Sequence, residues 1–353
     1  MKHTRVRFKL ICLVLAAASL FGLTACGETK ELQKMISAMD TEMTLTAYGN
    51  NAESGLNAAT AIITSMDSML DPDLTTSVTY AINNANGDKV VISGQVAQMI
   101  SAAKTVYEHS EGAFDLTVYP LVELWGFSDR RYYVPTDEEI LSELDRLCFD
   151  ELILTSFPST GTYTMSMPSY GRLSFASCAK GCAAANAIEA MRNAGVTSAI
   201  ISLGGNVQTL GTKPDGTNWN IAITDPNNTG SYLGVLSLGE AAVVTSGGYQ
   251  RYFEQNGKTY IHIIKPKSGY PVNNTLKSVT IICQDGTYAD CLSTALFVLG
   301  ESAALSYWRS YGKTDGGGFD MVLVNDKNEI TITSGLIEQF TLANKNYTVK
   351  YTE

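Results

Sequence analysis

Basic residues are scarce in this sequence. Its 25 Lys and Arg stand against 35 Asp and Glu, which gives a formal net charge of −10. Four of the bases lie in the first 26 residues, which contain no acid, so the rest of the chain has 21 bases against 35 acids, a charge of −14. Phosphate contacts draw on clusters of Lys and Arg. The charge balance therefore argues against nucleic acid as the main partner.

Long hydrophobic runs are also missing after residue 26. The only such run, residues 10–23, follows a basic segment and leads into Leu23-Thr24-Ala25-Cys26. This order resembles a bacterial lipoprotein signal, in which Cys26 becomes the lipidated first residue. A plain secretory signal and a single membrane anchor are the alternatives, but the run is short for a membrane span and its small-residue ending favours cleavage.

The signal predicts how the chain is organised. Residues 1–25 are expected to be a signal peptide, residues 26–34 a polar linker from lipidated Cys26, and residues 35–353 a folded domain. We therefore expect the protein to be exported and held by its lipid anchor at the extracytoplasmic face of the bacterial cell membrane.

Cysteine and histidine are too few for several kinds of site. Loss of Cys12 with the signal and lipidation of Cys26 leave five cysteines, an odd number with irregular spacing and no Cys-x-x-Cys pair. A disulfide framework is therefore not expected. Only His109 and His262 follow the signal, so a zinc site of the usual Cys/His kind has almost no ligands available.

Helical and strand patterns are mixed along the chain. Apolar residues recur at helical spacing in 51–70, 95–109, 179–193, 290–299 and 302–311, and strands are predicted at 41–48, 199–203, 219–224, 260–264, 278–283 and 321–324. Because strands and helices do not alternate regularly, an α+β fold is favoured over a doubly wound sheet. The Gly-x-Gly-x-x-Gly and Walker lysine motifs of common nucleotide sites are absent.

Asp290 and Thr294 are candidates for metal binding. They are four residues apart at the start of a predicted helix, so they share one helical face. Carboxylate and hydroxyl oxygens suit Mg²⁺, which completes its shell with water and substrate phosphates. The free N–H groups of the helix start would favour the same phosphates. The alternative is that Asp290 only caps the helix.

Two further segments have unusual composition. Phe114 and Asp115 lie in the segment 112–117 and precede Trp125, so these residues predict a pocket for a flat ring, with buried aromatics beside a turn as the alternative. His262 ends a predicted strand and is either a hydrogen-bonding or basic group, or a satisfied core histidine.

Taken in order, these segments resemble the ApbE family, the FAD:protein FMN transferases. The resemblance runs from about residue 35 to the C-terminus. It rests on eight short motifs in the family's order: Met39-Asp40-Thr41, 112–117 with 124–127, Ala179-Lys180-Gly181, Leu203-Gly204-Gly205-Asn206, 219–223 before Asp225-Pro226, 245–249, His262-Ile263-Ile264 with 266–271, and 289–297.

The resemblance implies a fold, a reaction and a set of site residues. The fold is ApbE-like and related to the T-fold, with mixed sheets and packed helices in one large domain of two subdomains. The reaction is Mg²⁺-dependent transfer of FMN from FAD to a threonine hydroxyl of an acceptor redox protein, with release of AMP. The implied FAD-contacting residues are Met39, Ala113, Phe114, Asp115, Ser174, Lys180 and His262, of which His262 also assists the transfer. The implied Mg²⁺-binding residues are Ser177, through its backbone oxygen, and Asp290, Ser293 and Thr294.

Several positions depart from the family pattern. Ser174 and Ala185 stand where the family commonly has acids, and Lys265 replaces an Asp after His262-Ile263-Ile264. Asp40 replaces a Gly, and Asp73 stands where a Tyr is expected. Loss of an acid that binds a ribityl or adenosine hydroxyl weakens FAD binding by roughly 1–3 kcal/mol where no other group replaces its hydrogen bond. These departures indicate a divergent, flavin-binding member.

The acceptor threonine is expected on another protein. Acceptors of this family carry Asp-Gly-x-Ser/Thr-Gly/Ala-Thr, and the segments that begin at Asp215, Asp285 and Asp315 do not complete that motif. The implied partner is a flavin-accepting membrane redox subunit. Two other functions stay open from the sequence: an FAD pyrophosphatase, which uses water as nucleophile, and a degenerate flavin-binding lipoprotein.

Overall fold

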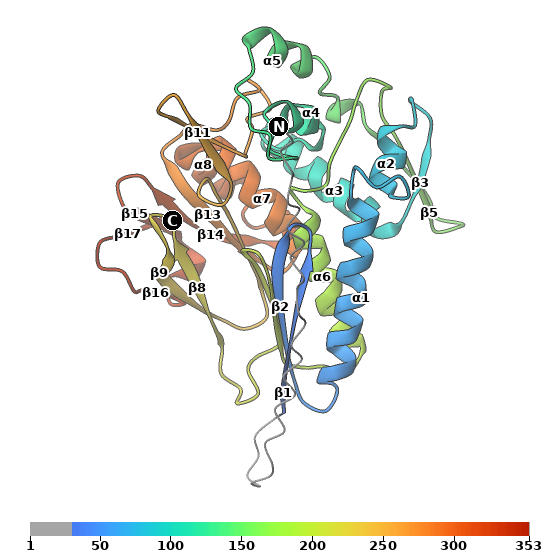
Figure 1. Ribbon diagram of the computed structural model, residues 1–353. Helices are drawn as coiled ribbons and strands as arrows, with labels where there is room; N and C mark the ends of the chain where they lie inside the picture. Colours follow the sequence, from blue (N-terminus) through green and yellow to red (C-terminus); the bar gives the residue numbers. More distant parts are fainter. Residues whose placement is uncertain (1–29, 353) are drawn as a thin grey trace, which may run out of the picture.

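A nine-stranded sheet organises the protein. The computed structural model describes residues 30–352. The strand order is β1-β2-β6-β7-β10-β13-β14-β15-β17 (Figure 1). Its strands are β1 (Glu31–Ala38), β2 (Thr41–Tyr48), β6 (Ala199–Leu203), β7 (Asn206–Leu210), β10 (Ala242–Gly247), β13 (Leu276–Cys283), β14 (Phe319–Asn325), β15 (Glu329–Thr333) and β17 (Thr348–Thr352). Only the last pair, β15 with β17, is parallel, which confirms the predicted α+β class.

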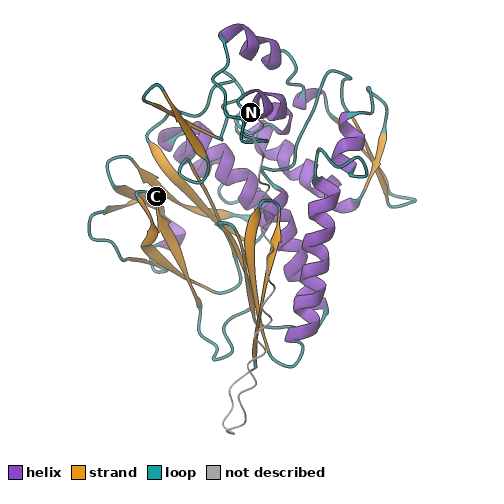
Figure 2. Cartoon of the chain, viewed as in Figure 1, coloured by secondary structure: helices purple, strands orange, loops and turns teal. Residues whose placement is uncertain are grey.

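Helices cover one face of this sheet (Figure 2). They are α1 (Ala52–Leu70), α3 (Gly94–His109), α6 (Ala179–Asn193), α7 (Gly286–Leu299) and α8 (Glu301–Tyr311). In α1, Ala59, Ile63 and Met66 follow one another at spacings of four and three residues, and all three are buried in the main core. Burial of such a stripe stabilises a helix more than its intrinsic propensity does.

A second, three-stranded sheet covers part of the opposite face. It consists of β16 (Phe340–Leu342), β9 (Asn228–Leu238) and β8 (Trp219–Asp225). Met321 and Leu323 of β14 belong to the core under the helices, whereas Val322 and Val324 pack toward the second sheet. Because β14 is buried on both faces, its sequence is a continuous apolar run and not an alternating one.

Shorter elements surround the two layers. They are β3 (Val90–Ile92), β4 (Ile153–Phe157) and β5 (Thr162–Ser166) in one small sheet, the hairpin of β11 (Tyr252–Gln255) and β12 (Lys258–Ile261), helices α2 (Val78–Asn83), α4 (Tyr119–Leu124) and α5 (Asp137–Leu144), and single 3-10 turns at Leu116–Val118, Phe149–Glu151, Asp315–Gly317 and Ser334–Leu336. Within residues 30–352, no helix combines the length and the hydropathy needed to span a membrane.

The predicted helices and strands are confirmed to within a few residues, with two informative exceptions. The helix predicted from residue 290 begins at Gly286, because the Asp285 side chain accepts hydrogen bonds from the N–H groups of Thr287 and Tyr288 and caps it. Asp290 is therefore one turn inside α7, and the interpretation of Asp290 as the cap of its own helix is wrong. The strand predicted at 260–264 ends at Ile261.

The folded part also begins earlier than residue 35. Strand β1 starts at Glu31 and pairs with β2 over its full length, so residues 31–34 belong to the sheet and not to the expected linker. The polar composition of this segment hid an alternation in which Leu32, Lys34 and Ile36 are half-buried and their neighbours exposed. The predicted signal peptide and Cys26 lie outside the described residues.

The five cysteines after Cys26 form no disulfide. Each is buried with a free thiol: Cys148, Cys178, Cys182, Cys283 and Cys291. This agrees with their odd number and irregular spacing. All five side chains are buried, which is consistent with a role in packing.

Candidate active site

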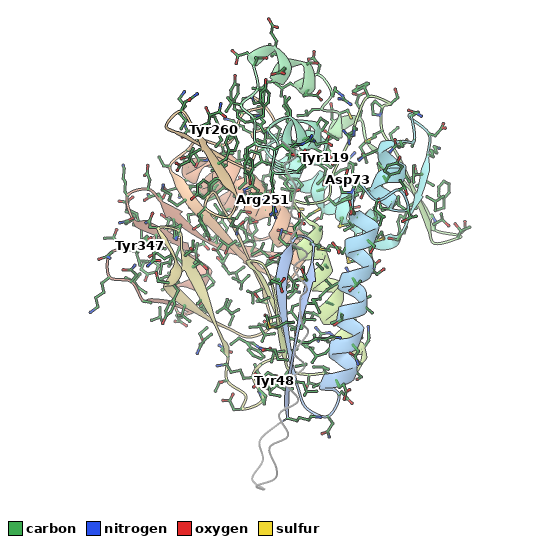
Figure 3. All side chains as sticks on the ribbon, in the orientation of Figure 1. Tyr48, Asp73, Tyr119, Arg251, Tyr260 and Tyr347 are labelled. Atoms are coloured by element: carbon green, nitrogen blue, oxygen red, sulfur yellow. The ribbon has the colours of Figure 1, made fainter. Side chains whose placement is uncertain are left out.

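A cavity of about 690 Å³ lies at the ends of the central strands. That volume is within the range of small-molecule sites. It is lined by the turn between β1 and β2, the loop after α1, residues 113–116, the start of α6, the turn from β6 into β7, the second half of β10, residues 262–264, and α7. Figure 3 labels three lining residues from different segments, Asp73, Tyr119 and Arg251.

The cavity brings together nearly all of the predicted site residues. Met39, Ala113, Phe114, Asp115, Ser174, Lys180 and His262 line it, together with Ser177, Asp290 and Thr294. Ser293 is the exception. It does not line the cavity, and its hydroxyl is already engaged within the protein, 3.0 Å from the Asp290 carbonyl and 2.9 Å from the Ser246 hydroxyl, so it is placed to hold Ser246.

Asp290 is the most deeply buried of the acids that line the cavity. It is 5% exposed, and its carboxylate accepts a hydrogen bond from the N–H of Gly181, at 2.7 Å. Burial raises the pKa of Asp290, and the Lys180 cation and the Gly181 N–H oppose that rise. A cation against this carboxylate would offset the cost of burying its charge.

The oxygen atoms around Asp290 fit Mg²⁺. Thr294 lies one helical turn further along α7, with its hydroxyl 3.4 Å from that of Ser246, and Ser177 lines the same cavity. Within residues 30–352, no three His, Cys, Asp or Glu side chains gather into a metal site of their own. Mg²⁺ needs only one or two carboxylates and completes its shell with water and phosphate oxygens, so the donor set is sufficient.

The helix start that faces the cavity belongs to α6, and the prediction that α7 presents free N–H groups there is wrong. Asp285 already caps α7, whereas Cys178, which precedes α6, supplies no side-chain cap within the described chain. Residues 176, 177, 179 and 180 at this start line the cavity. The Asp290 carboxylate, which accepts the Gly181 N–H, already lies at this positive helix end, and the Lys180 ammonium adds a positive charge beside it at the cavity.

Of the residues predicted to line a pocket for a flat ring, Phe114 and Asp115 line the cavity and Trp125 does not. Trp125 is fully buried in a separate core cluster, where its Nε1–H donates to the Gly269 carbonyl at 2.9 Å. Buried indole N–H groups need such a partner, and the carbonyl that provides it is 144 residues away in sequence. Phe127 and Tyr119 line the cavity instead.

Asp115 is held by its neighbour in sequence. One carboxylate oxygen accepts hydrogen bonds from both the N–H and the hydroxyl of Thr117, each at 2.6 Å. Burial raises the pKa of Asp115 to about 6, although the Thr117 hydrogen bonds lower it. Burial therefore makes the ionised form of Asp115 unfavourable. Hydroxyl or amide donors of a ligand would offset that cost by hydrogen bonding to the carboxylate.

His262 faces the cavity as a neutral imidazole. Its Nδ1 lies 3.1 Å from the Arg251 carbonyl, and because a carbonyl can only accept, Nδ1 carries the hydrogen. Nε2 is then an acceptor. Burial lowers the pKa of His262 to about 4, so the ring is uncharged near pH 7. Such a group can accept a proton from a hydroxyl but supplies no standing positive charge.

The turn between β1 and β2 explains one departure from the family pattern. Met39 and Asp40 both have positive φ, 50° and 58°, as a two-residue hairpin turn of type I′ requires. Asp tolerates this conformation better than most residues, so Asp40 can replace the usual Gly. The Asp67 carboxylate also accepts the Met39 N–H at 2.8 Å. Asp67 was not predicted, because it is one polar residue on an amphipathic helix.

The other departures differ in their relation to the cavity. Ser174 and Asp73 line it, so the lost acid and the lost tyrosine bear on ligand contacts. Ala185 lies well inside α6 and Lys265 is exposed on a loop, and neither lines the cavity. The family motifs by themselves did not show which of these four departures lie at the cavity.

Asn206, Ser246 and Arg251 also line the cavity, but no role was predicted for them. Asn206 and Ser246 belong to motifs that support the family resemblance, so the only available signal was their position in those motifs. Arg251 follows β10 and lies 3.9 Å from Asp40. Its approach to Asp40 depends on the tertiary fold.

Comparison with known proteins agrees with this site. The ApbE family profile matches residues 39–316. The chain is 30% identical over 310 residues to the FAD:protein FMN transferase of Haemophilus influenzae, covering 84% of this chain and 89% of that protein. It is 34% identical over 270 residues to the protein of the same name from Klebsiella pneumoniae, covering 76% and 81%. The crystal structure of the Pseudomonas stutzeri flavinyl transferase ApbE, in its apo form, superposes with a TM-score of 0.78 at 27% identity, covering 91% of this chain and all of that one. The chain therefore belongs to the ApbE family.

Proposed function

We propose that this protein is an FAD:protein FMN transferase, which moves FMN from FAD to a threonine hydroxyl of an acceptor redox protein in a Mg²⁺-dependent reaction. The observation that carries the proposal is the convergence of a buried carboxylate, Asp290, and a neutral acceptor, His262 Nε2, on one cavity. The curated relatives named above support the flavin chemistry.

The reaction is a phosphoryl transfer that needs positioning and charge neutralisation. The acceptor oxygen forms a bond to the FMN phosphorus while the bond from that phosphorus to the AMP oxygen breaks. His262 Nε2 is placed to take the hydroxyl proton. Lys180 and the start of α6 would hold the pyrophosphate oxygens.

Asp290, Thr294 and Ser177 would hold the Mg²⁺. When bound, Mg²⁺ would neutralise negative charge on the pyrophosphate. Phe114, fully buried at the cavity wall, contributes an apolar surface that excludes water from part of the site.

The test uses the purified protein with FAD, Mg²⁺ and an acceptor domain that carries Asp-Gly-x-Ser/Thr-Gly/Ala-Thr. We expect the acceptor to gain one covalent FMN by mass spectrometry, in a molar ratio of one to the AMP released. An acceptor with the last threonine of the motif replaced by alanine should gain none. Release of AMP and FMN without any acceptor adduct would identify a pyrophosphatase instead, and FAD binding without either product would identify a binding protein.

We also propose, from the sequence pattern alone, that Cys26 anchors the protein to the membrane by lipid on the extracytoplasmic face, beside a flavin-accepting membrane redox subunit. The sheet begins at Glu31, so only a few residues separate Cys26 from the folded domain. The Cys26→Ala variant is expected to leave the membrane fraction or to retain its signal. Normal processing with unchanged fractionation would contradict the anchor.

A further inference from the structure

Asn206 is a buried amide without hydrogen-bond partners. It is the first residue of β7 and follows Gly204 and Gly205, which both have positive φ. Its side chain is 0% exposed, and neither Oδ1 nor Nδ2 has a partner among the described residues. Asn206 also lines the cavity. A side-chain amide that is buried in this way costs free energy unless something else satisfies it.

The position of Asn206 distinguishes it from the other unpaired groups. Thr164, Gln208, Ser278 and Gln339 each have one buried side-chain oxygen without a partner in the part of the chain described, and none of these residues lines the cavity. Only Asn206 has both a donor and an acceptor unpaired there. This combination indicates that a ligand in the cavity provides the partners.

The sheet register places Asn206 on the same face as the predicted metal site. Asn206 pairs with Val244 of β10, so the two side chains share the face of the sheet covered by the helices. Ser246, two residues further along β10, points to that face as well. Its hydroxyl contacts Ser293 and Thr294 of α7, one turn from Asp290.

We propose that Asn206 binds the pyrophosphate of FAD. Its Nδ2–H₂ group would donate to a phosphoryl oxygen, and its Oδ1 would accept a hydrogen bond from a water molecule of the Mg²⁺ shell. An amide suits this position because it is neutral and offers both functions, whereas a carboxylate would repel phosphate. The inference rests on the proposed function for the identity of the ligand. It adds a residue that positions the reacting phosphate.

The test compares Asn206→Leu and Asn206→Asp with a matched control, Gln208→Met. Leucine has nearly the same shape as asparagine and removes both unpaired polar groups. Gln208 lies on the same strand and face, two residues beyond the cavity, so Gln208→Met controls for loss of a buried amide. The readouts are the melting temperature without ligand, its shift with FAD in the presence and absence of Mg²⁺, and the Kd for FAD by calorimetry.

We expect Asn206→Leu to melt no lower than wild type but to bind FAD at least about tenfold more weakly, with a smaller FAD-induced shift. Asn206→Asp should lose more affinity without Mg²⁺ than with it, since the cation screens the added carboxylate from phosphate. Gln208→Met should keep the wild-type Kd.

Two results would overturn the inference. One is a wild-type Kd and Mg²⁺ response in both Asn206 variants. The other is a lower melting temperature with an unchanged FAD-induced shift, which would assign Asn206 a structural role. Because all readouts are binding or melting, they separate this inference from the proposed function: a wild type that binds FAD yet transfers no FMN would contradict only the transferase reaction.

Discussion

Asp290→Asn is expected to abolish most of the Mg²⁺-dependent release of AMP from FAD while leaving the fold intact. Asparagine keeps an oxygen that can accept the Gly181 N–H, so the contact between α6 and α7 survives. It removes the negative charge that would hold the cation. Breaking a buried charge pair by removing one partner costs roughly 3–5 kcal/mol, which corresponds to about a hundredfold or more in metal affinity.

The stability of this variant should follow from burial. Burial raises the pKa of Asp290, so the ionised group is costly without a cation, and the metal-free variant should melt at or slightly above the wild-type temperature. AMP release over a series of Mg²⁺ concentrations, with thermal melting, measures both effects.

Asp285→Asn is the matched control for Asp290→Asn. Asp285 caps the same helix but does not line the cavity, and asparagine caps a helix as well as aspartate does. The control should retain wild-type rates. Equal Mg²⁺-dependent rates in Asp290→Asn and wild type would rule out Asp290 as a required ligand.

Gly181→Ala is expected to destabilise the protein by about 3 kcal/mol or more. A Cβ at this position would lie 2.0 Å from the Gly286 carbonyl oxygen and 2.6 Å from the Asp290 Cβ. The first of these is a backbone atom, so the clash is relieved only if α6 and α7 move apart. Overpacking in a dense core costs typically 1–3 kcal/mol, and backbone contacts lie at the upper end.

The same change should weaken the metal site, because the Gly181 N–H would no longer reach the Asp290 carboxylate at 2.7 Å. Chemical denaturation gives the stability change, and the FAD-induced melting shift gives the effect on the site. The control is Gly94→Ala, the first residue of α3, where a Cβ meets only Tyr163 at an ordinary 3.7 Å. It should be neutral or slightly stabilising. Similar stabilities for Gly181→Ala and Gly94→Ala would contradict the close helix contact.

The local pattern of the sequence was enough to predict most elements and the shared helical face of two residues that line the cavity. The helix over Ala179–Asn193 and the strand over Ala199–Leu203 lie where their periodicity predicted them. Asp290 and Thr294 do share one face of α7, since a spacing of four residues requires only that the segment be helical. The odd number and irregular spacing of the five cysteines after Cys26 also predicted that they form no disulfide framework. Each of these properties depends on residues close together in sequence.

Tertiary packing decided the properties that depend on distant partners. Nothing near Asp290 in sequence shows that the N–H of Gly181, 109 residues away, meets its carboxylate, or that α6 and not α7 presents its start to the cavity. Trp125 was predicted to line the pocket, but the Gly269 carbonyl holds it in a separate core. From the sequence, Asn206 is only a polar residue in a motif; folding buries its side chain without a hydrogen-bond partner among residues 30–352. Periodicity determines which face a side chain takes, whereas only the folded chain determines what lies opposite that face and whether its polar groups are satisfied.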